Sequence, residues 1–185
     1  MVLPLEMLMS EILCHREAGV LTLTLNRPER RNALNPRAYA EVEAAFKHAN
    51  ADPEVRCVIV TGSDPAFCSG EDVKEMMTGE APKTPRPVRV RFEPTPAAMA
   101  AIDCEKPVIA AVNGYALGAG FSLAMACDLR LISSRARIGQ LAVRNALTPP
   151  FGNLQHLIAA IGAQRTRELV YTGRILTAEQ AQEYG

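Results

Sequence analysis

Glycine and other small residues dominate one stretch, residues 113–120, in a pattern that suits the binding of an anionic oxygen. The apolar run 107–112 before it predicts a buried strand, and the run 121–126 after it predicts a helix. Glycine lets the backbone approach a ligand closely. The first amides of a helix have no acceptor inside it and carry partial positive charge. A helix that begins near Gly118 would therefore present free N–H groups to a phosphate or to a developing oxyanion.

A second stretch has the same design. Residues 55–62 predict a strand that ends in glycine, and residues 66–73 predict a loop that leads into a short helix. Two such turns can each aim one amide at a single oxygen, which is the arrangement that stabilises a thioester enolate. The glycines alone are explained equally well by tight packing of strand against helix. Their order, G-x-x-x-G-x-G, does not match the dinucleotide-binding fingerprint.

Four segments in order resemble the crotonase superfamily, also called the enoyl-CoA hydratase/isomerase family. They are residues 25–34 (LNRPERRNAL), 66–73 (AFCSGEDV), 106–120 (KPVIAAVNGYALGAG) and 126–129 (ACDL). The resemblance implies an α/β fold, the ClpP/crotonase-like spiral of β-β-α units, over residues 11–185, after a tail of residues 1–10. Family chains continue past Gly185 with helices that cover the core, so we expect those C-terminal helices to be missing and apolar surface to be exposed. The resemblance also implies a homotrimer or hexamer.

The resemblance assigns roles to several positions. It implies that the backbone amides of Ser69 and Ala119 form an oxyanion hole. It places the coenzyme A portion of an acyl-CoA substrate near Arg27, Arg30, Ala33, Gly70, Asp72 and Gly118. The arginines would meet phosphates, although surface charge near a turn explains them too. We expect Asp72 to cap the helix that follows it.

Two departures from the family pattern concern catalysis. Hydratases of the family carry glutamates at the positions of Ser122 and Ala142. Hydration needs a positioned base for water and an acid for Cα, and neither residue supplies one. We therefore do not expect simple hydratase activity. Glu71 is among the nearest acids in the matching segments, but acidic residues are favoured at helix starts in any case.

Several functions stay open. The first is a lyase or isomerase that stabilises an acyl-CoA enolate, and the second is a catalytically inactive acyl-CoA-binding or scaffold protein. Decarboxylation of a malonyl-type thioester needs no base, and Arg144 would hold the substrate carboxylate if it does not form a surface ion pair. A Clp-type serine protease built on Ser122 is disfavoured, because no histidine lies close to it in the sequence.

Composition limits the alternatives. Twenty basic and twenty acidic residues cancel, so neither nucleic acid nor an anionic membrane is an expected partner. The chain has no apolar run of the ~20 residues that a membrane helix needs and no basic leader, so we expect a cytoplasmic protein. Five cysteines without a CxxC pair indicate reduced thiols and no zinc site. No tightly bound cofactor is expected, since coenzyme A enters with the substrate.

The remaining patterns predict the elements around the turns. Strands are expected at residues 11–17 and 19–25, with alternating leucines on a buried face, and later at 128–133 and 137–139. Helices are expected at residues 36–50, 96–103, 151–161, 164–172 and 178–185, with Asn35-Pro36 and Thr177 at two of their starts. Met99 and Ile102 are expected to pack together, and residues 79–87 to form a loop.

Overall fold

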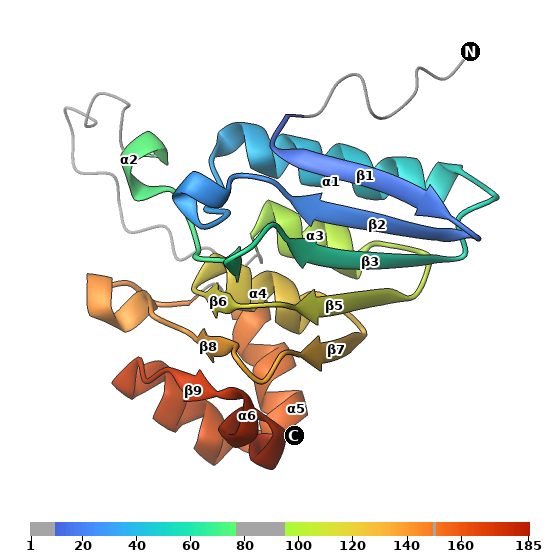
Figure 1. The fold of residues 1–185 in the computed structure, drawn as a ribbon. Coiled ribbons are helices and arrows are strands. Elements are labelled where there is room, and N and C mark those ends of the chain that lie inside the picture. Colours follow the sequence, from blue (N-terminus) through green and yellow to red (C-terminus); the bar gives the residue numbers. More distant parts are fainter. Residues whose placement is uncertain (1–9, 77–94, 150) are drawn as a thin grey trace.

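The computed structural model describes residues 10–76, 95–149 and 151–185. Strands and helices alternate along the chain (Figure 1). The strands are β1 (Ile12–Glu17), β2 (Val20–Leu25), β3 (Cys57–Gly62), β4 (Ala66–Cys68), β5 (Val108–Val112), β6 (Tyr115–Leu117), β7 (Leu129–Ile132), β8 (Arg137–Gly139) and β9 (Leu176–Thr177). The α-helices are α1 (Pro36–Ala51), α2 (Val73–Met76), α3 (Pro96–Ile102), α4 (Ala119–Ala126), α5 (Phe151–Thr172) and α6 (Ala178–Tyr184). Two 3₁₀ helices are η2 (Pro28–Arg30) and η3 (Ala142–Asn145).

Two sheets are built by a repeating unit. The larger sheet has the order β1-β2-β3-β5-β7 and the smaller one β4-β6-β8-β9. Each turn of the chain adds one strand to the first sheet and the next to the second, as β3 then β4, β5 then β6, and β7 then β8. Pairing is parallel from β2 to β7 and from β4 to β8. The predicted α/β spiral of β-β-α units is therefore confirmed.

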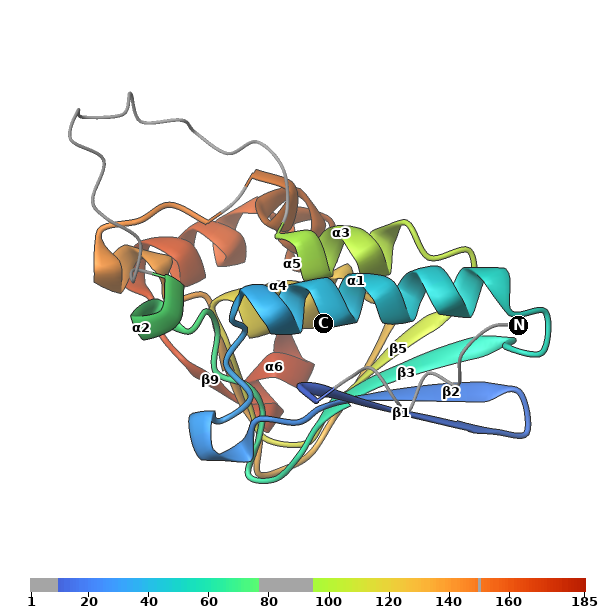
Figure 2. The same cartoon turned by 90° about the horizontal axis from the view of Figure 1, so that it is seen from above.

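Helices α1 and α3 cover one face of the larger sheet, as seen from above (Figure 2). The face of β2 beneath them carries Leu21, Leu23 and Leu25, all at most 2% exposed, as the alternation predicted. On α1, Val42 and Phe46 pack into the same core at helical spacing. Pro36 begins α1, and the Asn35 side chain accepts from the Ala38 amide at 2.7 Å, so both start signals act as expected.

The short strands β4 and β6 were not predicted from the sequence. Both glycine-rich segments were interpreted as turns, but each contains three residues of strand, β4 and β6. A run of three residues is too short to display a period of two. The expected packing pair on α3 was also wrong, because Ala97, Ala98 and Ala101 form its buried face and Ile102 is 36% exposed. The predicted loop at 79–87 and most of the expected tail lie outside the described residues.

In the last part of the chain, the helices break and begin at the residues that the sequence predicted. Gly162 interrupts α5 with non-helical angles, which confirms the predicted junction of two helices. Thr177 and Gln180 form a reciprocal capping box at the start of α6. The two-residue strand β9, which pairs with β8, was not predicted.

Apolar surface is exposed on the edge strand β7. Leu129 is 61% exposed and Leu131 is 67% exposed. This agrees with the expectation of uncovered apolar surface. Over the described ranges, no helix has both the length and the apolar character required to cross a membrane.

We predict that Gly120→Ala lowers the free energy of unfolding by about 2–3 kcal/mol, because overpacking a tight contact costs that much. A Cβ atom at Gly120 would lie 2.3 Å from the Cys68 carbonyl oxygen, so α4 would have to move away from β4. Urea unfolding followed by circular dichroism measures the change. An unaltered midpoint would contradict this close approach.

Candidate functional site

The two glycine-rich turns meet in space. A Cβ atom at Gly70 would lie 3.2 Å from the Leu117 carbonyl oxygen and 3.7 Å from the Ala119 amide nitrogen. A Cβ atom at Gly118 would lie 3.9 Å from the Gly70 Cα. The backbones at the start of α4 and before α2 are thus in contact. Only residues without side chains allow this approach, so the fold brings the two predicted turns together.

The start of α4 supplies one backbone donor. Ala119 is the first residue of this helix, so its amide has no acceptor within the helix. Gly118 precedes it with a φ of 52°, and its own amide donates to the Gly139 carbonyl at 3.0 Å. The hydrogen bond from Gly118 therefore ties the turn to β8. The next amide, that of Ala119, is not used in this bond.

The neighbouring turn supplies a second donor, at Glu71. The Leu34 amide donates to the Gly70 carbonyl at 2.8 Å, and the Asp72 amide donates to the Leu34 carbonyl at 2.9 Å. In such a parallel bridge the intervening residue directs its own N–H and C=O away from the bridging strand. The Glu71 amide therefore points away from Leu34, and the preceding residue, Gly70, lies close to Gly118 and the Ala119 amide.

The predicted donor Ser69 needs correction. Its amide already donates to the Arg31 carbonyl at 3.0 Å, so it is committed to holding the loop. Gly70 has a φ of 112°, and this left-handed conformation reverses the direction in which successive amides point. The family resemblance pointed to Ser69, but the direction of each amide in this loop depends on the backbone angle at Gly70.

Ser122 and Ala142, the positions at which the resemblance predicts glutamate in a hydratase, are linked by one side chain. The Gln140 side chain joins them, because its Nε2 donates to Ser122 Oγ at 3.3 Å and its Oε1 accepts from the Ala142 amide at 3.3 Å. Ser122 Oγ in turn donates to the Gly118 carbonyl at 3.0 Å. Ser122 is 1% exposed and Gln140 is 4% exposed. A neutral, buried clamp thus occupies this side of the turn. Gln140 was not among the residues predicted for the site.

Arg27 lies at the centre of an ionic cluster. Its Nε contacts Glu11 at 2.8 Å, and its Nη1 contacts Asp72 at 3.1 Å. Its Nη2 contacts Glu75 at 2.6 Å, and Nη1 also donates to the Ala33 carbonyl at 2.6 Å. These contacts occupy the guanidinium, and Arg27 is only 6% exposed, so it is not free to bind a phosphate. The expectation that Arg27 binds coenzyme A phosphates is therefore not supported by its contacts.

Asp72 links this cluster to the site. Its carboxylate accepts from the Glu75 amide at 3.3 Å, which confirms the predicted cap on α2. Burial by itself would raise the pKa of Asp72. The hydrogen bonds from the Glu75 amide and from Arg27, with the positive charges of Arg27 and Arg30, hold that pKa below its usual range.

The other predicted residues are spread around the turns. Arg30 is exposed on η2, whereas Ala33 is buried and contributes its carbonyl to Arg27. The Glu71 side chain is exposed and accepts from the Tyr39 hydroxyl at 3.2 Å. Arg144 is exposed on η3, with its Cγ 3.2 Å from where a Cβ atom at Gly173 would lie.

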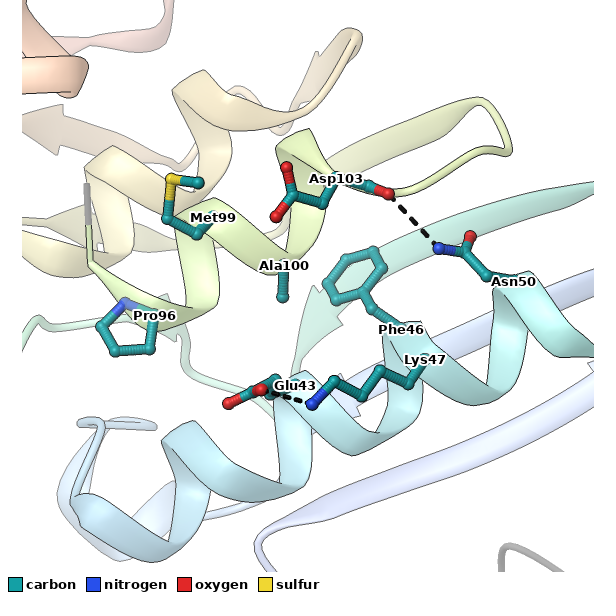
Figure 3. A pocket seen from close by; sticks show the side chains of 8 residues that line it. All are labelled: Glu43, Phe46, Lys47, Asn50, Pro96, Met99, Ala100 and Asp103. Carbon is teal, nitrogen blue, oxygen red and sulfur yellow. Dashed lines mark hydrogen bonds and ion pairs between the residues drawn. The ribbon is translucent and has the colours of Figure 1, made fainter. Parts of the chain in front are cut away.

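A pocket elsewhere contains none of these residues (Figure 3). It lies between α1 and α3 and is lined by Glu43, Phe46, Lys47, Asn50, Pro96, Met99, Ala100 and Asp103. Lys47 is held by Glu43, and Asn50 donates to the Asp103 carbonyl. Its volume of about 230 Å³ is below that of typical small-molecule sites, about 300–1,000 Å³. Across the residues that the structure describes, no group of acidic, histidine or cysteine side chains is arranged to hold a metal ion.

We predict that Asp72→Asn lowers the free energy of unfolding by about 3 kcal/mol at pH 7, because it breaks a buried ion pair. The pKa of Asp72 is lower in the folded state, so its contribution is present above the unfolded pKa of about 3.9 and is lost as the pH falls through the folded pKa. The difference between the two proteins should therefore shrink below about pH 4.

Urea unfolding at several pH values measures this difference. Asp103→Asn, at an exposed carboxylate after α3, is the control and should change stability by less than about 0.5 kcal/mol. A difference for Asp72→Asn that does not shrink as the pH falls below about 4 would contradict the ionic origin of the effect.

Comparison with known proteins identifies the family of the chain. A sequence profile described as enoyl-CoA hydratase/isomerase matches residues 15–185. A probable enoyl-CoA hydratase of Mycobacterium tuberculosis is 39% identical over 176 residues, which cover 94% of this chain and 66% of that protein. The 1,2-epoxyphenylacetyl-CoA isomerase of Escherichia coli is 37% identical over 181 residues, which cover 96% of this chain and 68% of that protein.

Solved structures give the same result. The crystal structure of an enoyl-CoA hydratase from Bacillus anthracis superposes with a TM-score of 0.84 at 33% identity, covering 95% of this chain and 68% of that one. The chain spans about two thirds of the length of the relatives it matches. On the profile match, the identities and the shared fold, the chain belongs to the enoyl-CoA hydratase/isomerase family.

Proposed function

We propose that the chain binds an acyl-CoA thioester and stabilises negative charge on its carbonyl oxygen with the backbone amides of Glu71 and Ala119. The observation that supports this most directly is the contact between the two turns, where Gly70 lies against the Ala119 amide. Family membership supplies the substrate class. Each amide would donate to the oxygen as the thioester becomes an enolate, and losing one such donor typically costs about 3–4 kcal/mol of barrier.

The proposal excludes simple hydration as the main reaction. Ser122 and Ala142 occupy the glutamate positions, and Gln140 joins them in a neutral clamp. None of these groups takes a proton from water at neutral pH. We place the protein instead among lyases or isomerases of the family that stabilise an enolate. The expected homotrimer or hexamer would cover the exposed Leu129 and Leu131 of β7.

A second candidate is decarboxylation of a malonyl-type thioester. The neutral clamp favours it, because Ser122, Gln140 and Ala142 carry no negative charge that would repel a substrate carboxylate. The bond between Cα and the carboxylate would break, carbon dioxide would leave, and the electron pair would pass to the enolate oxygen before Cα takes a proton. Release of carbon dioxide from malonyl-CoA or methylmalonyl-CoA would support this candidate, and binding of both without turnover would favour a catalytically inactive binding protein.

We predict that a thioester bound to the protein shows a weakened carbonyl bond. Infrared spectra of butyryl-CoA labelled with carbon-13 at the carbonyl should show the band at lower frequency when bound, because hydrogen bonds to the oxygen polarise it. Ala119→Pro removes one donor at a first helical position and puts the proline ring where the amide hydrogen pointed, so it should abolish most of the frequency shift.

Ala178→Pro is the matched control, because it makes the same change at the first position of α6. The band should shift as in the unchanged protein. If the unchanged protein binds the thioester without any shift, the proposed oxyanion site is refuted.

We also predict slow hydration of crotonyl-CoA, at least about 100-fold below a family hydratase that carries both glutamates, since positioned acids and bases contribute about 10²–10⁴. Loss of the enoyl absorbance measures the rate, with that hydratase assayed in parallel. Hydration at a comparable rate would show that the clamp of Ser122, Gln140 and Ala142 does not prevent this chemistry.

A further inference from the structure

Arg27 takes part in no step of the proposed chemistry, yet it is among the most heavily bonded side chains near the site. It follows β2 and is 6% exposed. Its guanidinium contacts carboxylates from two directions, Glu11 before β1 and the pair Asp72 and Glu75 around the start of α2. One positive charge therefore faces three negative ones.

Stability alone does not account for this cluster. Taking charges out of water is costly, and a well-packed apolar group in place of a buried ion pair is often neutral or stabilising. The planar guanidinium fork differs from an apolar group in that it fixes the direction of each partner. The cluster is therefore best explained by the geometry that it imposes on the groups it holds.

One of those partners is directly bonded to the donor residue of the site. Asp72 follows Glu71 in the chain, and its carboxylate lies on Arg27 Nη1 at 3.1 Å. The same residue donates its amide to the Leu34 carbonyl at 2.9 Å, and Gly70 accepts from the Leu34 amide at 2.8 Å. The Glu71 peptide is thus held at both ends, by Leu34 through the backbone and by Arg27 through the Asp72 side chain.

The segment that includes Leu34 is anchored by the same residue. Arg27 Nη1 donates to the Ala33 carbonyl at 2.6 Å, and the Arg27 amide donates to Asn32 Oδ1 at 2.9 Å. Asn32, 1% exposed, donates to the Ser63 and Ala66 carbonyls at 2.7 Å each. Arg27 therefore joins both strands of the bridge that orients the Glu71 amide.

We propose that Arg27, acting through Asp72, is the positioning residue that aims the Glu71 amide at the substrate oxygen. This inference rests on the proposed function, because it gives that amide its task. A shift of about 1 Å in such a donor is enough to cost about 100-fold in rate, so the ionic cluster controls catalysis without touching the substrate.

The test compares two carboxylates on the same guanidinium. Asp72→Asn removes the charge next to Glu71 and keeps a side chain that caps a helix well. Glu11→Gln removes the negative charge that contacts Arg27 Nε from the side of β1, and Glu11 is not adjacent to Glu71 in the chain. Both substitutions keep the shape of the side chain and weaken the cluster, but only Asp72→Asn acts next to Glu71.

The readout is the infrared carbonyl band of carbon-13-labelled butyryl-CoA, with its affinity measured in parallel by calorimetry. Asp72→Asn should lose about half of the frequency shift, as expected when one of two donors is misdirected. Glu11→Gln should keep the full shift. Equal shifts in Asp72→Asn and in the unchanged protein, or equal losses in both variants, would overturn the inference while leaving the proposed function in place.

Absence of any shift in the unchanged protein would refute the proposed function and this inference together. Hydrogen exchange at low temperature covers the case in which Asp72→Asn folds only weakly. Peptides that span residues 66–75 should then exchange at least about tenfold faster in Asp72→Asn than in Glu11→Gln, because local opening follows the loss of local contacts. Equal exchange in the two variants would again overturn the role of Asp72.

Discussion

The site depends on one constraint, the close approach of two backbone turns. Gly70 lies against Gly118 and the Ala119 amide, and Gly120 lies against Cys68 on β4. A side chain at Gly120 would clash with Cys68, and the positive φ angles of Gly70 and Gly118 favour glycine at both positions. Because each turn begins where a strand of the small sheet ends, parallel pairing of β4 with β6 brings the two ends to the same place. The first amides of α4 are then presented at this junction without an acceptor inside the helix.

The charges around this junction are divided between its two sides. Toward α2, one buried guanidinium meets Glu11, Asp72 and Glu75, and the Asp72 carboxylate stays ionised because its pKa is held low. Toward η3, the contacts are neutral, since Gln140 bridges Ser122 and the Ala142 amide. The ionic side holds Asp72 next to Glu71, whereas Ser122, Gln140 and Ala142 on the neutral side carry no ionisable side chain. On the proposed function, this division would suit reactions in which charge moves onto the thioester oxygen.

Much of this fold was predictable from local patterns. Alternating leucines predicted β2, Asn35-Pro36 predicted the start of α1, and Gly162 predicted the break in α5. These signals are local, because they arise from period, capping and forbidden backbone angles. The short strands β4, β6 and β9 carry no such signal and exist because a neighbouring strand pairs with them. Likewise, Ile102 is apolar but exposed, because the alanines of α3 lie closest to the core.

The sequence by itself determined that two strand–turn–helix segments rich in small residues are present, that Ser122 and Ala142 stand where hydratase carboxylates were expected, and that the chain resembles a family built on such turns. These are properties of residue types and their order. Only the tertiary structure decided that the Ser69 amide donates to the Arg31 carbonyl while the Glu71 amide points away from Leu34. It also decided that Arg27 forms an ion pair with Asp72 and is not free for a phosphate. The reason is physical: where an amide or a guanidinium points depends on backbone angles and on partners distant in the chain, which residue order does not specify.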